Sequence, residues 1–173
     1  QIGQAVAQPP HFVYEIAVRA FTRLHPAVPE PLRGTIAGIA HPALIEHFVK
    51  LGVDTVELMP VAAWIDERHL QSLGLSNAWG YNPVALMAPH PLLAPGGMAE
   101  LRKAVEVLRG AGIAVILDAV FNHTGESDAF GTTLSLRGLD NALYYRHAES
   151  GERINDTGTG NTLAVERPEV LRL

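Results

Sequence analysis

Three apolar segments of the chain have the pattern of buried strands. Residues 12–18, 53–59 and 113–117 are short and rich in apolar and β-branched side chains, as strands of parallel sheets are. The last segment is bounded upstream by glycine and ends at Asp118, and we expect it to be buried on both faces. The pattern therefore predicts a sheet of at least three strands.

Two longer segments between these strands have the pattern of amphipathic helices. In residues 42–51 and about 98–111, apolar positions recur at helical spacing, which predicts one buried stripe on each helix. Pro42 stands at the first position of the earlier helix, and Gly52 follows its end. Gly112 follows the later helix. Proline at a helix start and glycine after a helix end are ordinary boundary signals.

The order of these elements predicts an α/β fold with a parallel sheet. Segments after the strands are long and weakly patterned (19–41, 61–97 and 125–160), whereas connections after the helices are nearly absent. This asymmetry is typical of a (β/α) barrel whose site lies at the carboxyl ends of its strands. An open doubly wound sheet is the structural alternative, but it would usually carry a glycine-rich first turn for phosphate, which is absent here.

The two ends of the chain have their own patterns. Residues 1–11 include the dipeptide Pro9-Pro10 and are interpreted as a linker from a missing N-terminal module. Pro168 marks the start of a helix near the end of the sequence. A helix of about one turn buries almost nothing, so we expect that Leu173 is a cut and not a native terminus.

Composition narrows the classes of partner. The chain has 173 residues, 47% hydrophobic and 18% charged, which fits one globular domain. A net charge of -5 without a Lys/Arg cluster argues against nucleic acid. No apolar segment has membrane-spanning length, and the absence of cysteine excludes disulfides and Cys-ligated zinc while fitting a reducing compartment. We expect a soluble, cytoplasmic protein with no membrane or nucleic-acid partner.

The carboxyl end of the third predicted strand carries polar chemistry. Asp118 ends the apolar run, and Asn122 and His123 follow it on the next loop. An ionised carboxylate is costly in an apolar core, so the strand is expected to open into a polar site. A plain turn, in which Asp and Asn bond their own backbone, is the alternative. Asp118 and His123 could also hold a metal, but two ligands are too few, and no metal is predicted.

Several motifs together resemble the α-amylase family of glycoside hydrolases, and within it the isoamylase-type debranching enzymes. The resemblance covers residues from about 12 to the end of the chain. An Asp followed five positions later by His is a weak signal alone, but its combination with the Trp-Gly-Tyr-Asn-Pro motif of the preceding loop is specific. The segments that carry the resemblance are 14–16, 19–22, 24–26, 33–35, 53–61, 74–77, 79–83, 118–123, 135–141 and 158–163.

The resemblance implies a function and a fold for the longer protein. The fold would be a (β/α)8 TIM barrel, of which residues 12–173 supply about three strands with their helices as a truncated catalytic domain. The reaction would be retaining hydrolysis of α-1,6 branch linkages in glycogen or branched maltodextrin, without a cofactor. The nucleophile and the acid would lie beyond Leu173, so no Asp or Glu of this chain is assigned to catalysis and the chain alone is expected to be inactive. Branching enzymes and maltooligosyl trehalose hydrolases share these motifs, and a non-catalytic sugar-binding fragment is a further alternative.

The resemblance also implies one side of a sugar subsite. Tyr81 would stack on the sugar ring at the cleavage point, and His123 would hydrogen-bond a hydroxyl of the same sugar, a pairing that suits a neutral ring. Asp118 would orient the missing Arg and nucleophile in a supporting role.

Further residues are weaker sugar-contact candidates. Asn122 and Asn161 are carried over from the resemblance, the latter only from its Gly-Asn-Thr context. Trp79 is included, although we favour a buried structural role for it because large aromatic side chains are usually buried. Three strands cannot close a barrel, so the outer strands are expected to present open edges through which the chain self-associates.

Overall fold

The computed structural model describes residues 11–173, which pack into two compact units. The first unit contains residues 11–61 and 88–118, and the second contains residues 62–87 and 119–173. The predicted linker therefore lies outside the described residues except for His11. The interpretation of residues 12–173 as one partial barrel domain stays a prediction.

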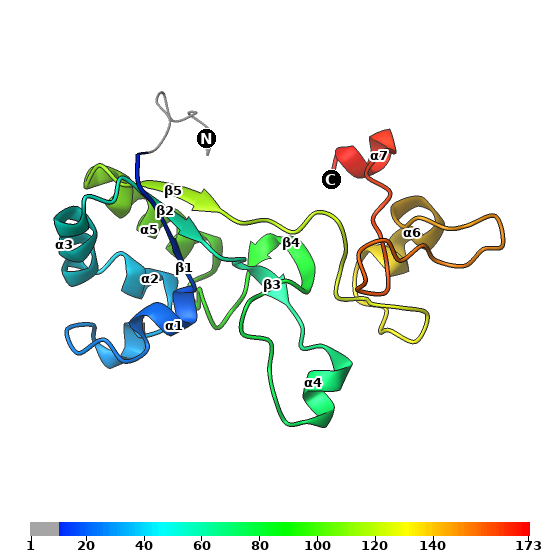
Figure 1. The fold of residues 1–173 in the computed structure, drawn as a ribbon, viewed down its shortest axis with the longest axis horizontal. Coiled ribbons are helices and arrows are strands. Elements are labelled where there is room, and N and C mark those ends of the chain that lie inside the picture. Colours follow the sequence, from blue (N-terminus) through cyan, green and yellow to red (C-terminus); the bar gives the residue numbers. More distant parts are fainter. Residues whose placement is uncertain (1–10) are drawn as a thin grey trace. The chain divides into compact units, whose positions relative to one another are not determined.

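The first unit is built on a three-stranded parallel sheet (Figure 1). Its strand order is β1-β2-β5, and in the shared register Tyr14 lies beside Val56, which lies beside Val115. The predicted parallel α/β arrangement is confirmed. The strands are β1 (Val13–Ile16), β2 (Thr55–Leu58) and β5 (Ala114–Leu117), and the helical elements are α1 (Val18–Thr22), the 3-10 helix η1 (Glu30–Leu32), α2 (Ile36–Ile39), α3 (Pro42–Leu51) and α5 (Gly97–Gly110).

Helix α3 begins and ends where the sequence predicts. Pro42 is at its first position, and the His41 side chain accepts a hydrogen bond from the Ala43 amide. Gly52 takes the left-handed conformation after the last turn, with φ of 75°. Phe48 is fully buried on the inner face, where it packs edge-on against Tyr14 of β1. The helix is therefore anchored to the sheet by an aromatic contact.

Strand β5 departs from the expected burial on both faces. Ile116 and Leu117 at its carboxyl end are 38% and 39% exposed. Within the described residues β5 pairs with β2 alone, so it is an edge strand whose second side lacks a neighbour. The expectation of burial on both faces is wrong because it assumed a strand inside the sheet.

The second unit contains a two-stranded sheet and three helices. Strand β3 (Ala62–Trp64) pairs with β4 (Pro83–Pro89), whose last two residues belong to the first unit, and α4 (Arg68–Ser72) lies between them in the chain (Figure 1). Helices α6 (Leu136–Tyr144) and α7 (Pro168–Leu171) follow. The buried side chains of Leu136, Tyr145 and Leu163 form a hydrophobic cluster. No helix in residues 11–173 is both long and apolar enough for a membrane span.

Candidate functional site

The loop that carries Tyr81 is shaped by Asn77. The Asn77 side-chain oxygen accepts hydrogen bonds from the backbone amides of Trp79 (2.9 Å) and Gly80 (2.8 Å). The backbone amide of Asn77 donates to the Asp66 carboxylate (2.6 Å). Gly80 has φ of +84°, a conformation that side chains other than glycine's rarely adopt. This turn presents Tyr81 with 37% of its surface exposed.

His123 is buried and connected to the Tyr81 loop. Its Nε2 lies 2.9 Å from the Tyr81 carbonyl oxygen, and because a carbonyl only accepts, Nε2 carries the proton. Burial lowers the pKa of the His123 imidazole, although the Tyr81 carbonyl and the Glu67 carboxylate oppose this shift. The ring is therefore neutral near pH 7, and Nδ1 is an acceptor. The Asn122 Oδ1 lies 2.9 Å from Nδ1. Because the two ends of a side-chain amide are alike in shape, a 180° turn of the Asn122 amide would bring its N–H to this acceptor.

Asn161 holds the backbone that follows His123. Its side-chain oxygen accepts from the Thr124 amide (3.0 Å), and its Nδ2 donates to the carbonyls of Thr124 (2.8 Å) and Ser127 (3.1 Å). Asn161 is fully buried. Its amide thus satisfies polar backbone groups inside the unit, which buried groups require.

Glu126 is a fully buried carboxylate close to the same segment. Burial alone would raise the pKa of its carboxyl group, but hydrogen bonds from the Tyr145 hydroxyl and from the amides of Ser135, Leu134 and Arg137 outweigh burial and lower that pKa. Burial, followed by the bond to Glu126, raises the pKa of the Tyr145 phenol well above its usual range. Glu126 is therefore ionised and Tyr145 is protonated at neutral pH.

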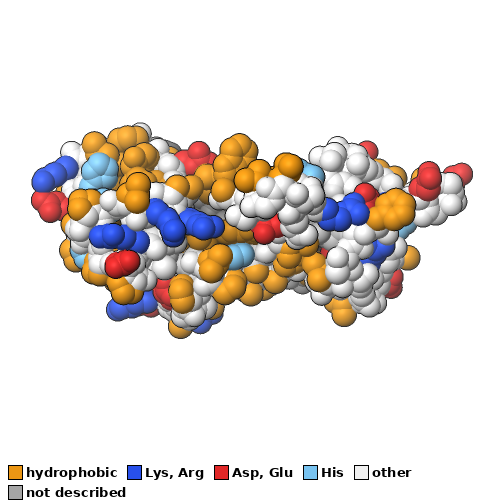
Figure 2. Space-filling model, turned by 90° about the horizontal axis from the view of Figure 1, so that it is seen from below, with side chains coloured by type: hydrophobic (Ala, Val, Ile, Leu, Met, Phe, Trp, Pro, Cys, Tyr) orange, Lys and Arg blue, Asp and Glu red, His pale blue; other side chains and the backbone are white. Residues whose placement is uncertain are grey.

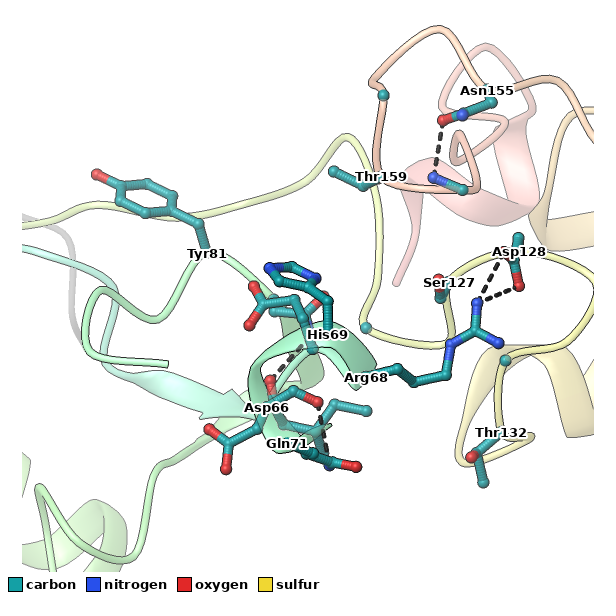
Figure 3. A pocket seen from close by; sticks show the side chains of 17 residues that line it. Asp66, Arg68, His69, Gln71, Tyr81, Ser127, Asp128, Thr132, Asn155 and Thr159 are labelled. Carbon is teal, nitrogen blue, oxygen red and sulfur yellow. Dashed lines mark hydrogen bonds and ion pairs between the residues drawn. The ribbon is translucent and has the colours of Figure 1, made fainter. Parts of the chain in front are cut away.

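A pocket of about 820 Å³ lies within the second unit (Figure 3). Its size is in the range of small-molecule sites. In Figure 3 Arg68 reaches from α4 toward Asp128, and its Nη2 donates to both carboxylate oxygens at 2.7 Å. The lining residues are mostly hydroxyl, amide and charged side chains or glycines: Ile65, Asp66, Glu67, Arg68, His69, Gln71, Tyr81, Asn82, Gly125, Ser127, Asp128, Gly131, Thr132, Asn155, Gly158, Thr159 and Gly160.

The charges of the pocket fit a neutral ligand better than an anion. Three carboxylates, those of Asp66, Glu67 and Asp128, line it together with the single guanidinium of Arg68. On the face shown in Figure 2, Lys and Arg side chains are interspersed with Asp and Glu side chains. Hydroxyl and amide groups in the lining suit a ligand that is itself rich in hydroxyls.

Four of the six predicted site residues lie near one another in the second unit. Tyr81 contacts His123, His123 contacts Asn122, and Asn161 bonds the backbone of the residue after His123. Their contacts with sugar stay predictions. Asp118 is half-buried after β5 in the first unit, where its amide donates to the Leu58 carbonyl at 2.9 Å. Its supporting role also stays a prediction.

Trp79 is placed differently from the expectation. It is 69% exposed on the Asn77 turn, so the expected burial is wrong. In residues 11–173 no group of three or more His, Cys, Asp or Glu side chains is arranged to hold a metal ion. Three residues that organise the site, Asn77, Glu126 and Tyr145, were not among the predicted ones. Asn77 could have been suspected from the Asn-x-x-Gly turn it begins, whereas nothing in the local pattern indicates a buried Glu126.

Comparisons with known proteins identify relatives of this chain. No family model matches it. The glycogen debranching enzyme of Yersinia enterocolitica is 53% identical over 92% of the chain and 25% of that enzyme. The glycogen debranching enzyme of Yersinia pseudotuberculosis (strain PB1/+) is 54% identical over 91% of the chain and 25% of that enzyme.

Solved structures of pullulanases share the fold. The pullulanase of Anoxybacillus sp. LM18-11, solved with maltotetraose, superposes with a TM-score of 0.75 at 32% identity, over 92% of this chain and 25% of that one. The type I pullulanase of Bacillus subtilis, solved with maltose, superposes with a TM-score of 0.74 at 26% identity, over 99% and 26% of the two chains. The chain spans about a quarter of the length of these relatives. The predicted resemblance is confirmed. Over nearly its whole described length, this chain is similar to a segment that makes up about a quarter of each of these glycogen debranching enzymes, and its fold is shared by the pullulanases.

Proposed function

We propose that this chain is part of a debranching hydrolase that cleaves α-1,6 branch linkages in glycogen or branched maltodextrin with retention of configuration. The observation that carries the proposal is the 53% identity with a glycogen debranching enzyme over 92% of the chain. The contact between His123 and the backbone carbonyl of Tyr81 supports it, because it holds the loop that presents the partly exposed Tyr81 side chain, and an aromatic face suits an uncharged sugar.

The sheet of the first unit is proposed to be the first three strands of a (β/α)8 barrel. Three parallel strands in the order β1-β2-β5, with helices in the connections, support this proposal. The TM-score of 0.75 with a pullulanase adds to it. The site would then lie at the carboxyl ends of the strands, where Asp118 follows β5.

The residues of the chain are proposed to bind and position the substrate. Tyr81 would offer a face to the sugar ring, and His123 would keep the Tyr81 loop in place. Asp118 would orient the catalytic groups. The nucleophile and the acid of a retaining hydrolase are not assigned to any Asp or Glu of this chain.

The test is an assay of the whole polypeptide that contains this chain, with limit dextrin as substrate. Release of linear maltooligosaccharides is the expected result, and the 173-residue chain alone should release none. Transfer of glucan without release of linear chains would contradict the proposal and favour a branching enzyme. Release of trehalose from a trehalose-capped glucan would favour a maltooligosyl trehalose hydrolase.

A non-catalytic sugar-binding role is the second candidate, and the neutral-ligand character of the 820 Å³ pocket favours it. Titration of maltotetraose into the 173-residue chain, followed by amide NMR shifts, tests this role. Shifts confined to the pocket lining would support it. Equal shifts in the wild type and in a Tyr81→Ala variant would count against it. We expect weak binding, because the catalytic half of the subsite is not present in this chain.

Self-association is proposed for the isolated chain. Within the described residues β1 and β5 each pair on one side only, and open strand edges favour pairing with a second copy. Sedimentation velocity should show mass increasing with concentration. A monomer at all concentrations would contradict this.

A cytoplasmic location is also proposed. The cysteine-free sequence supports this location, which fractionation of cells would test.

A further inference from the structure

We infer that Tyr145 is a positioning residue: its hydroxyl joins the buried Glu126 carboxylate to Thr124 and so holds His123 against the Tyr81 carbonyl. The inference rests on the proposed function only in giving the Tyr81 loop a substrate to bind. The connection itself is carried by contacts inside the second unit.

The first part of the connection is a fixed carboxylate. Glu126 Oε1 accepts from the amides of Leu134 (2.6 Å) and Ser135 (2.8 Å), and Oε2 accepts from the amide of Arg137 (2.9 Å). These amides lie just before and within the first turn of helix α6, where no residue of the helix can accept from them. Ser135, at the N-cap position, makes no side-chain cap. Glu126 therefore caps α6 from outside the helix, and the helix in turn immobilises the carboxylate.

The second part is the Tyr145 hydroxyl, whose hydrogen-bond direction is determined. It lies 2.5 Å from Glu126 Oε2 and 2.7 Å from Thr124 Oγ1. An ionised carboxylate only accepts, so Tyr145 donates to Glu126, and Thr124 donates to the Tyr145 oxygen. Thr124 Oγ1 also accepts from the Glu126 amide at 3.3 Å. The Arg153 guanidinium lies 5.1 Å above the Tyr145 ring and restrains its plane.

The third part leads from Thr124 to His123. Asn161 bonds both the amide and the carbonyl of Thr124, so the backbone at this residue is held from one side and its hydroxyl from the other. His123 precedes Thr124 directly, and its imidazole reaches the Tyr81 carbonyl. Removing the Tyr145 hydroxyl would leave the Thr124 hydroxyl without its acceptor and so loosen residues 123–124. The amides at the start of α6 would still hold the Glu126 carboxylate in place.

The test is a Tyr145→Phe variant of the chain, uniformly labelled with nitrogen-15. NMR measures the exchange rate with water of the His123 Nε2 proton and of the backbone amide protons of Leu134, Ser135 and Arg137. We expect the imidazole proton to exchange roughly fivefold faster or more, the size that loss of one buried hydrogen bond gives. The amide protons at the start of α6 should change less. Tyr144→Phe, the same change on a half-buried neighbour, is the control and should leave the imidazole proton unchanged.

Thr124→Val and Thr124→Ser provide a second test that does not alter the hydrophobic cluster of Leu136, Tyr145 and Leu163. Valine keeps the shape and removes the hydroxyl, so it should accelerate imidazole exchange, and serine should restore the wild-type rate. Unchanged exchange in both Tyr145→Phe and Thr124→Val would overturn the inference. Equal acceleration at α6, or unfolding of both variants by circular dichroism, would also overturn it, because the role would then be structural.

The readout separates this inference from the proposed function. The imidazole proton is observed without sugar, so failure of the whole polypeptide to hydrolyse limit dextrin would contradict the proposed function alone. In that polypeptide Tyr145→Phe should raise KM for limit dextrin more than it lowers kcat, since it acts on the sugar-binding loop and not on the reacting groups.

Discussion

His123 donates its Nε2 proton to the carbonyl oxygen of Tyr81, 42 residues earlier in the chain, across 2.9 Å. The bond fixes both the tautomer of the imidazole and the backbone of the loop that presents Tyr81. Because His123 is only 5% exposed, its Nε2–H has no ready access to water as an alternative acceptor. Loss of the imidazole would remove this bond together with the packing of a buried side chain.

Replacement of His123 by alanine should destabilise the second unit by about 1–3 kcal/mol, because it removes a buried side chain and its hydrogen bond to the Tyr81 carbonyl. His123→Gln should lose less stability than His123→Ala, since the glutamine side-chain N–H can donate to the same carbonyl. Urea unfolding followed by tryptophan fluorescence measures this, because both tryptophans, Trp64 and Trp79, lie in the second unit. His69→Ala, an exposed change on α4, is the control. Equal midpoints for His123→Ala and the wild type would show that the contact is not made.

The free energy of unfolding should depend on pH through His123. Burial lowers the folded-state pKa of the imidazole below its ordinary value of about 6.5, so below pH 6.5 the unfolded chain binds a proton that the folded chain does not. Stability should therefore fall as the pH drops from about 6.5 to the folded-state pKa and level off below it. Urea unfolding at several pH values, compared between the wild type and His123→Gln, isolates this part. A difference between the two proteins that stays constant over this window would contradict the pKa shift.

Tyr81 should contribute to substrate binding through its ring and not its hydroxyl. In the whole polypeptide, Tyr81→Ala should raise KM for limit dextrin about tenfold, a loss expected when an aromatic face against a sugar is removed. Tyr81→Phe keeps the face and should stay near wild type. Leu75→Ala, an exposed change in the segment before the same loop, is the matched control. If phenylalanine were as harmful as alanine, the hydroxyl would carry the contact and stacking would be excluded.

The sequence could predict the elements whose own residues specify them. Helices α3 and α5 carry a sustained apolar stripe with a glycine after the last turn, and both are found within about one residue of the predicted ends. The three parallel strands are short apolar runs between those helices. Strand β3 has three residues and α2 has four, which is too short for any period to be recognised.

Helix α6 shows why the remaining elements could not be predicted. Gly138 lies inside it, and Asp140 has non-helical angles (φ of −159°, ψ of 94°), so the helical period is interrupted. Its start depends on a carboxylate ten residues before Leu136, that of Glu126, and not on a local cap. Elements that depend on such non-local contacts give no signal in a short window of sequence.

The site was predictable in its residues but not in its contacts. Tyr81 and His123 were identified through the resemblance to a family, yet only the fold shows that they contact each other. Trp79 was expected inside because it is large, but the Asn77 turn presents it outward. Burial preferences describe residue types on average, and a turn made by a neighbouring side chain can override them.

Gly52 should be required at the end of α3 for its backbone conformation alone. Its φ is 75°, and an added Cβ would meet no atom within 4 Å, so Gly52→Ala changes the backbone energy without creating a clash. We expect a loss of about 1 kcal/mol, the cost of placing a side chain in the left-handed region. Gly110 in the last turn of α5 has equally open surroundings but no positive φ, so Gly110→Ala should be neutral or stabilising by up to about 1 kcal/mol.

Amide hydrogen exchange in α3 and α5 measures each effect locally. Faster exchange in α3 of Gly52→Ala, together with unchanged or slower exchange in α5 of Gly110→Ala, is the expected pair of results. Equal effects of the two substitutions would mean that conformation does not decide the choice of glycine at position 52.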